Sequence, residues 1–564
     1  MKQQNPHHDP LIPPPDAVWF LPLGGAGEIG MNLGLYGTNG RWLMVDCGLT
    51  FPDDQTPGIE VIMPDVGFIA QRRDLLDGIV ITHGHEDHLG AIMYLWPSLR
   101  CPVYATRFAA EILRAKLVDV GLEDDVPIIE IPSGGAFTAG SFDCAFVPVT
   151  HSIPESQMLV LRTPHGIVVH TGDWKLDSDP VVGPVTDVAR LESLGREGVL
   201  AVISNSTNAL VPGISKTELS VQQTLERLFP TVTGRLVLTC FSSHVARVHS
   251  AMKVAEQCGR TVALVGRSLR RNAGIGADCG YLPLHNTTVS DREIMRLPPE
   301  SAAIIVTGGQ GEVRAALSRI AAGQHPTVRL DPGDTVIFSA RVIPGNEHAV
   351  GRVQNLLTHK RVHLVTPEDA QVHVSGHPPR GDLEKLYAWL KPRLVVPVHG
   401  ELRHQVAHAR LAEACGVVQT LTPHDGALMR LGPGPAEIIA EVPTHRLALE
   451  GTVLKPLAHT GADQRFKLGR VGAVVLTVVV DGKGRCTQPP RITLLGLEGG
   501  SSPDGANLRT ALGEVAEDSL RTVPQGMGRD DEAIRKALMK AIRAFLRDEY
   551  GREPLIETHI IRAS

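Results

Sequence analysis

Three histidines and an aspartate crowd into the stretch THGHEDH, as His83, His85, Asp87 and His88. The stretch follows the apolar run IVIT, so it begins where a buried strand is expected to end. Imidazole nitrogens and carboxylate oxygens are typical ligands of transition metals. A tight strand-to-helix turn can aim such side chains at one point, with His83 and His85 serving one ion, and Asp87 and His88 another. The alternative is a histidine-rich surface turn that arose by chance.

Two divalent cations held side by side would make this loop a hydrolytic centre. Such ions, about 3.5 to 4 Å apart, can bring the pKa of water to about 7 and hold both oxygens of an in-line displacement. Gly84 suits a tight bend between the first two histidines. Because each ion needs several ligands, further ligands are expected from distant parts of the chain.

Polar residues also follow other apolar runs. The segments FDCAFVPVTHS and GIVVHTGDW each contain a probable strand with a polar residue at its carboxyl end, which introduces His151 and Asp173. Helical patterns such as RFAAEILRAKLVDVG (107–121) separate the strands. This order is typical of an α/β fold in which strand ends converge on one edge of a sheet. Taken singly, each of these polar residues is equally typical of a structural role.

The chain divides by pattern into several parts. Residues 211–365 alternate helix and strand, which predicts a mostly parallel sheet, and histidines again end strands after them. We therefore expect one domain from 18–210 and 366–445, interrupted by an inserted domain. The tail 1–17 is predicted to be disordered and 446–465 to be a linker. Residues 466–564 should form a small α+β domain with a hairpin at DGKG (481–484) and a helix that buries Ile534, Leu538, Ile542 and Phe545.

The composition narrows the possible partners and compartments. The formal net charge of −6 excludes a generally basic coat for nucleic acid but permits a local basic channel. Aromatic residues make up only 4%, which argues against an extended base-stacking platform. The eight cysteines form no CxxC pair, and no signal-like start or long apolar run is present. A cytoplasmic protein with no membrane anchor is expected.

The chain resembles the metallo-β-lactamase superfamily in its HxHxDH motif, in a later lone histidine and a later lone aspartate, and in the aspartate of MVDCG, which precedes the motif. The motifs SNSTNA (204–209), HVSGH (373–377) and PVHGE (397–401) are similar to those of its β-CASP nucleases, most closely the bacterial ribonuclease J family. LGGAGEIGMN, TCFSSHVARV, TGGQGE and FSARVIPGNE occur in that family's order. The resemblance implies an αβ/βα sandwich with an inserted β-CASP α/β domain and a small C-terminal α+β domain.

The same resemblance assigns roles to single residues. His151 would complete the first metal site, Asp173 would bridge both ions and take part in catalysis, and His399 would join the second site. Asp46 would support the ligand loop without touching metal. His377 would contact the scissile phosphate and protonate the leaving oxygen. The substrate-binding loop would consist of His373, Val374, Ser375, Gly376 and His377, although His373 could instead orient the loop.

The resemblance also implies an activity. The expected protein is a metal-dependent ribonuclease, both a 5′-to-3′ exonuclease and an endonuclease, which leaves 5′-phosphates during mRNA decay and RNA maturation, including rRNA processing. It would use two divalent ions, zinc or else manganese, on single-stranded RNA, preferably 5′-monophosphorylated. A homodimer or larger homo-oligomer, aided by the C-terminal domain, is expected. A basic groove walled by Arg247, Arg267, Arg270 and Arg271, with loop amides near Gly308 and Gly345, would hold phosphates.

One residue departs from the family pattern. Asn205 stands where the ribonuclease J motif usually has aspartate, so a hydrogen-bond acceptor remains but a charge is lost. The departure keeps open a catalytically weak RNA-binding subunit of a nuclease assembly. A small-molecule metallo-hydrolase also shares HxHxDH, but such an enzyme gives no reason for the later histidine motifs.

Overall fold

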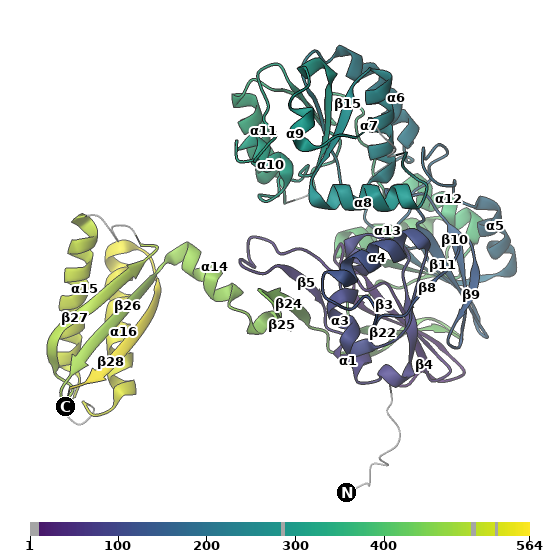
Figure 1. The fold of residues 1–564 in the computed structure, drawn as a ribbon. Helices are drawn as coiled ribbons and strands as arrows, with labels where there is room; N and C mark the ends of the chain where they lie inside the picture. Colours follow the sequence, from purple (N-terminus) through teal and green to yellow (C-terminus); the bar gives the residue numbers. More distant parts are fainter. Residues whose placement is uncertain (1–10, 284–287, 344, 498–502, 525–527, 564) are drawn as a thin grey trace, which may run out of the picture. The chain divides into compact units, whose positions relative to one another are not determined.

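The computed structural model describes residues 11–283, 288–343, 345–497, 503–524 and 528–563. The chain forms two compact units, one of residues 1–50 and 63–446 and the other of residues 51–62 and 447–564 (Figure 1). The first unit carries the predicted ligands. Each unit is described separately below.

Two mixed sheets form the centre of the first unit. The first sheet has the order β23 (Glu437–Glu441), β22 (Ala427–Gly432), β1 (Val18–Gly24), β3 (Leu33–Thr38), β4 (Arg41–Val45), β6 (Leu76–Val80), β7 (Val103–Ala105) and β8 (Ile128–Glu130). The second has the order β21 (Gln419–Thr420), β19 (Leu394–Val398), β13 (Val199–Asn205), β12 (Gly166–His170), β11 (Gln157–Thr163), β10 (Phe142–Pro148) and β9 (Ala136–Ala139).

The two sheets pack against one another through a shared core. Phe20 of the first sheet and Phe146 and Leu161 of the second belong to one buried cluster. A second cluster lies on the other face of the second sheet and includes side chains of α5 (Val188–Glu197), α12 (Arg380–Leu390) and α13 (Leu402–Ala414). This layering confirms the predicted sandwich.

Strand order explains why distant segments meet at one edge. The strands β12, β13 and β19 are parallel neighbours, with Val202 of β13 opposite both Val169 and Val395. Their carboxyl ends therefore lie side by side, as expected for parallel strands. Asp173, Asn205 and His399 occur at or just after these ends.

The inserted domain is built on a five-stranded parallel sheet. Its order is β15 (Thr261–Val265), β16 (Ala302–Val306), β14 (Leu236–Thr239), β17 (Thr335–Phe338) and β18 (His363–Val365). Strands such as AAIIV are buried along their whole length because helices cover both faces. The domain's longer helices are α6 (Glu218–Leu228), α7 (Val245–Gln257), α8 (Arg267–Asp278) and α11 (Glu347–His359). The predicted parallel βα architecture is confirmed.

The second unit contains the C-terminal sheet, with the order β27 (Cys486–Leu495), β26 (Ala473–Val480) and β28 (Leu555–Arg562). β26 and β27 pair in antiparallel register around the predicted turn at 481–484. Ile534, Leu538 and Ile542 of α16 (Asp531–Tyr550) are buried against this sheet, and Phe545 packs beside them. The hairpin and the apolar helix face are both confirmed.

Two stretches differ from the expectation of irregular chain. Within 446–465, β24 (Arg446–Glu450) and β25 (Val453–Pro456) pair in antiparallel register, and α14 (Ala462–Val471) begins. Residues 1–10 of the predicted tail lie outside the described residues. The carbonyls of Pro13 and Pro14 accept hydrogen bonds from the amides of Gly40 and Asn39, which orders this part of the tail. Across the described parts of the chain, we find no helix that has both the length and the apolar character to cross a membrane.

Candidate metal centre

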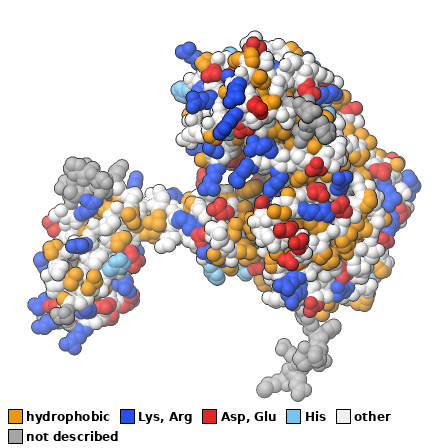
Figure 2. Space-filling view, viewed as in Figure 1, with side chains coloured by type: hydrophobic (Ala, Val, Ile, Leu, Met, Phe, Trp, Pro, Cys, Tyr) orange, Lys and Arg blue, Asp and Glu red, His pale blue; other side chains and the backbone are white. Residues whose placement is uncertain are grey.

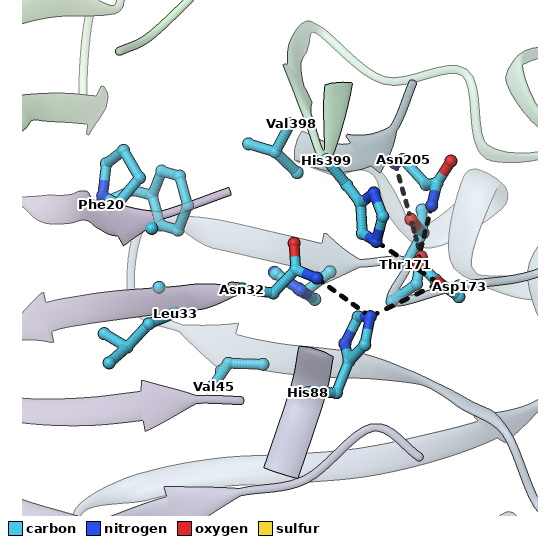
Figure 3. Close-up of a pocket in the computed structure, with 15 residues that line it drawn as sticks. Phe20, Asn32, Leu33, Val45, His88, Thr171, Asp173, Asn205, Val398 and His399 are labelled. Carbon is cyan, nitrogen blue, oxygen red and sulfur yellow. Dashed lines mark hydrogen bonds and ion pairs between the residues drawn. The ribbon is translucent and has the colours of Figure 1, made fainter. Parts of the chain in front are cut away.

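The structure brings all seven predicted metal ligands together. They form two groups of four, in each of which the ligand atoms lie within 4.8 Å of one another. The first group is His83, His85, His151 and Asp173, and the second is Asp87, His88, Asp173 and His399. Asp173 belongs to both groups. Figure 3 shows His88, Asp173 and His399 pointing toward one another from separate elements.

The spacing within each group fits coordination of a cation. Two ligand atoms about 2.1 Å from a tetrahedral ion lie roughly 3.4 Å apart. In the first group, His85 Nδ1 is 3.0 Å from His83 Nε2 and 3.1 Å from His151 Nε2. In the second, Asp173 Oδ2 is 3.4 Å from His88 Nε2 and 3.5 Å from His399 Nε2. The same oxygen is 3.9 Å from His83 Nε2, so it can serve both groups.

Hydrogen bonds fix the orientation of two ligand rings through a buried aspartate. His88 donates through Nδ1 to Asp46 Oδ2 over 2.7 Å. Thr82 Oγ1 donates to the same carboxylate, so it must accept from His83 Nδ1, 3.0 Å away. Both rings therefore present the lone pair of Nε2 to the centre, as a metal ligand requires. Asp46 lies outside both ligand groups.

Two further ligand rings are fixed by partners to which the sequence analysis gave no such role. His151 donates through Nδ1 to the carbonyl of Gly376 over 2.6 Å. Thr207 Oγ1 donates to the carbonyl of His399 and accepts from Nδ1 of the same ring. His399 has a φ of +50°, which is unusual for histidine, and its amide donates to the Gly25 carbonyl. Only its place in the motif SNSTNA could have indicated Thr207 from sequence.

Burial and neighbouring charges leave two central groups in the forms that bind cations. Burial lowers the pKa of His85 to about 4, so its ring is neutral at pH 7. Burial alone would raise the pKa of Asp173, but His399 and His88 beside it hold that pKa well below its usual range. A neutral imidazole and an ionised carboxylate are the protonation states that a metal ion requires.

Gly84 is needed for space rather than for a special backbone angle. It is absent from the glycines with positive φ. A Cβ atom placed there would lie 2.8 Å from Ile112 Cδ1 of α4 (Arg107–Val118) and 3.3 Å from Ile153 Cδ1. The chain bends at Gly84 as expected, and the missing side chain also lets the ligand loop pack closely against α4. Glu86, which had no expected role, pairs with Lys116 of the same helix.

Family models match four parts of the chain. They are described as the beta-lactamase superfamily domain (41–195), the beta-CASP domain of ribonuclease J (233–357), the Zn-dependent metallo-hydrolase RNA specificity domain (368–423) and the ribonuclease J C-terminal domain (462–563). A curated ribonuclease J of Sinorhizobium meliloti is 39% identical and covers the full length of both chains. The chain belongs to the ribonuclease J family.

Other comparisons agree with this assignment. A ribonuclease J of Thermus thermophilus is 34% identical, with 96% of this chain and 95% of the relative covered. A crystal structure of a protein of unknown function from Enterococcus faecalis V583 covers 73% of this chain at a TM-score of 0.51. Its 16% identity supports the fold alone. The family establishes a nuclease of the metallo-β-lactamase fold, and the RNA specificity match supports RNA binding.

Asn205, the departure from the ribonuclease J pattern, lies against the shared ligand. Its Oδ1 accepts from the amide of Thr207, so its Nδ2 faces the centre. Nδ2 donates to Asp173 Oδ1 over 2.6 Å and lies 3.2 Å from His377 Nδ1. Because an amide nitrogen only donates, His377 must accept at Nδ1 and carry its proton on Nε2. Asparagine therefore holds both the carboxylate and the histidine in place.

Residues of the predicted substrate loop differ in what their side chains and backbone groups contact. His377 lies beside the second ligand group, with its ring centroid 5.6 Å from that of His399. Ser375 Oγ accepts from Asn208 Nδ2, and the amide of His377 also approaches it. The Gly376 carbonyl is taken by His151, so only its amide is left for a substrate.

Val374 and His373 do not join the centre. Val374 is buried among protein atoms, so its side chain cannot contact substrate. Burial and then the Arg247 guanidinium lower the pKa of His373 to about 3, because the ring lies beside a buried cationic cluster. The buried Nδ1 of His373 has no hydrogen-bond partner among the described residues, so both expected roles, phosphate binding and orientation of the loop, stay predictions.

Arg247 was expected on the wall of an RNA groove, and this prediction is wrong. The side chain is completely buried and pairs with Glu218 at 3.0 Å. Sequence alone could not distinguish a buried arginine from an exposed one here, because its partner lies 29 residues away. Arg267, Arg270 and Arg271 line a cavity whose walls come from the inserted domain and from Asp119.

Proposed function

We propose that this chain cleaves single-stranded RNA as a 5′-to-3′ exonuclease and an endonuclease, leaving 5′-phosphates, in mRNA decay and RNA maturation. The observation that carries the proposal is the pair of ligand groups that share Asp173 Oδ2 beside His377. A cavity of about 20 Å³ reaches His88, Asp173 and His399, which is space for an ion or a water molecule.

Individual residues around the metal centre have different roles in the cleavage reaction. When bound, two divalent ions supply charge compensation for the phosphodiester and an acidified water molecule for in-line attack. Asn205 holds Asp173 and His377 in fixed orientation. His377 carries its proton on Nε2, for which no described residue provides a hydrogen bond, so this N–H stabilises the charge on the departing 3′ oxygen by a hydrogen bond, and that oxygen takes its proton from water. Ser375 Oγ already accepts from Asn208, so its own proton is free for a phosphate oxygen.

The donor set suits zinc, with manganese as the alternative, because histidine and carboxylate ligands serve both metals. The eight cysteines are free thiols, which supports placement in a reducing compartment such as the cytoplasm. We also propose a homodimer or larger homo-oligomer, assisted by the C-terminal unit. Val475, Thr477 and Val479 of its central strand β26 are only partly buried, unlike their neighbours in the strand.

A direct test compares RNA and a thioester as substrates of the metal-loaded protein. Cleavage of 5′-monophosphorylated RNA to products with 5′-phosphates is expected, without thioester hydrolysis. His85→Ala should abolish RNA cleavage and lower the bound metal. The control is His424→Ala, since His424 is an exposed histidine of the same unit, paired with Glu441. Retained RNA turnover in His85→Ala, or hydrolysis of the thioester alone, contradicts the proposal.

His377→Ala separates stabilisation of the leaving oxygen from metal binding. Turnover should fall by roughly 100- to 1000-fold, the usual effect of removing one hydrogen-bond donor to a developing oxyanion. Bound metal should stay near the wild-type value, because His377 belongs to neither ligand group. A parallel loss of metal would place His377 among the ligands instead.

A further inference from the structure

A large polar cavity lies at the carboxyl end of the parallel sheet in the inserted domain. Its volume is about 830 Å³, within the range of sites for small organic ligands. Loops after three neighbouring strands line it: Phe241 and Ser242 after β14, Arg267 after β15, and Gly308 and Gly309 after β16. The carboxyl edge of a parallel sheet is where α/β folds commonly bind ligands. None of the predicted ligands or loop residues of the metal centre lines this cavity.

The lining is suited to phosphate. Five arginines line the cavity against three carboxylates, although the chain as a whole has a net charge of −6. Arg270 and Arg271 pair with Asp291 and Asp119 at 3.2 Å. Arg267 and Arg314 are exposed and have no ion pair within the described residues. Figure 2 shows blue side chains gathered on this part of the molecule, over the region of α8 and α10 (Ala316–Ala321).

The backbone adds further donors to the same cavity. Helix α8 begins at Arg267, so its unpaired first-turn amides and the positive end of its dipole face the lining. Gly308 has a φ of +116° and Gly309 follows it, which brings bare backbone to the surface of the cavity. A Cβ atom at Gly308 would crowd Ala315 at 3.0 Å. Arginine side chains and backbone amides therefore converge on one polar space.

One aromatic side chain completes the lining. Phe241 is 39% exposed although it is among the large apolar residues, and aromatic residues make up only 4% of the chain. An exposed ring beside cationic groups can stack on a base while the cations hold its phosphate. We propose that this cavity binds one nucleotide unit of the RNA strand, with its phosphate at Arg267 and Arg314 and its base on Phe241.

The distance to the metal centre sets the RNA length that reaches this subsite. Helix α4 links the two places, because Ile112 packs at Gly84 in the ligand loop and Asp119 after the helix lines the cavity. Asp119 follows Ile112 by seven positions, which corresponds to about 10 Å along the helix axis. A stacked strand advances about 3.4 Å per nucleotide, so roughly three nucleotides bridge that distance. A dinucleotide would be too short, whereas a decamer would reach.

The inference rests on the proposed ribonuclease function, and its test uses the full-length, metal-loaded protein. The double variant Arg267→Gln/Arg314→Gln is compared with Arg296→Gln/Arg329→Gln, which removes two exposed arginines outside the cavity. Phe241→Ala is a third variant. Binding and cleavage of 5′-monophosphorylated decamer and dinucleotide are measured at several salt concentrations, and thermal unfolding confirms that each variant is folded.

The decamer should bind the double variant more weakly, and the slope of log Kd against log salt should fall by about 0.7, because the variant no longer neutralises one phosphate of the single strand. Phe241→Ala should weaken decamer binding roughly fivefold or more, as loss of base stacking does. Dinucleotide cleavage should be unchanged in both. The control variant should behave as wild type for both substrates.

Three outcomes would overturn the subsite. They are an unchanged salt slope, an equal loss for decamer and dinucleotide, or an equal effect of the control variant. Titration with free AMP tests the other source of a nucleotide: binding of AMP that the double variant abolishes, with decamer binding intact, would assign the cavity to a free nucleotide. If wild-type protein neither binds nor cleaves the decamer, the proposed function itself fails, which is distinguishable from all of these results.

Discussion

The buried ion pair between Arg247 and Glu218 gives the sharpest prediction about stability. The Arg247 guanidinium lies 3.0 Å from Glu218 and also donates to the carbonyls of Ser339 and Val372. Neither charged side chain of the pair is exposed by more than 2%. Arg247→Met keeps much of the volume but leaves the Glu218 carboxylate buried with only Lys175 and His244 nearby.

Removal of one member of a buried pair costs about 3 to 5 kcal/mol. For a domain of about 150 to 250 residues, each kcal/mol shifts Tm by about 2 to 4 °C, which predicts a decrease of about 6 to 20 °C. The measurement is thermal unfolding of the full-length chain. Arg271→Met serves as the control, because its exposed ion pair with Asp119 should contribute at most about 1 kcal/mol.

A second variant tests whether the stability is lost because the Glu218 charge is left unpaired. Glu218→Gln/Arg247→Met removes both charges, so part of the stability lost in Arg247→Met should return. Arg247→Met should also lower kcat, because the Val372 carbonyl that it holds directly precedes the loop containing Ser375 and His377. A Tm for Arg247→Met within 2 °C of wild type, or a double variant less stable than the sum of the single variants, would refute this reasoning.

Three further predictions concern the centre and its surroundings. Asn205→Ala should lower kcat by roughly 10- to 100-fold with metal retained, the usual effect of losing a partner of the ligands; a change in KM alone would contradict its positioning role. Saturating zinc at 100 times its Kd should stabilise wild type by about 2.7 kcal/mol in unfolding experiments, and His85→Ala should lose most of this gain. Burial and then Glu28 raise the pKa of Asp425 to about 7, so wild type should lose stability as pH rises from about 4 to 7. Asp425→Asn should remove that loss of stability. Asp77→Asn should instead lower the stability above about pH 4, because Arg41 and Ser141 hold the pKa of Asp77 low despite its burial. Equal profiles of Tm against pH for the two variants would contradict these assignments.

The loop ligands could be predicted from sequence because they are local. His83, His85, Asp87 and His88 lie within one turn, so their spacing alone indicates a shared centre. His151, Asp173 and His399 came from family resemblance, since nothing in their own surroundings separates a ligand from a structural residue. The structure brings them together through strand order, which single-sequence patterns do not specify.

The errors share a physical cause. Burial of Arg247 depends on Glu218, which lies 29 residues away in the chain, so it is a tertiary effect. The chain at 446–456 has weak local strand signals but gains order by pairing β24 with β25. Asn205 orients Asp173 and His377 by donating to both, but it lacks the charge by which a carboxylate would stabilise a protonated histidine.

The register of β13 beside β19 has a consequence for how such nucleases diversify. Asn205 pairs with Val398, so the chain departs from the sandwich and re-enters it on adjacent strands. The residues at the ends of these two strands therefore keep their positions around the cations, whichever domain is inserted between the strands. Evolution can therefore replace the inserted domain, and with it the polymer that the enzyme accepts, while the metal centre keeps its geometry.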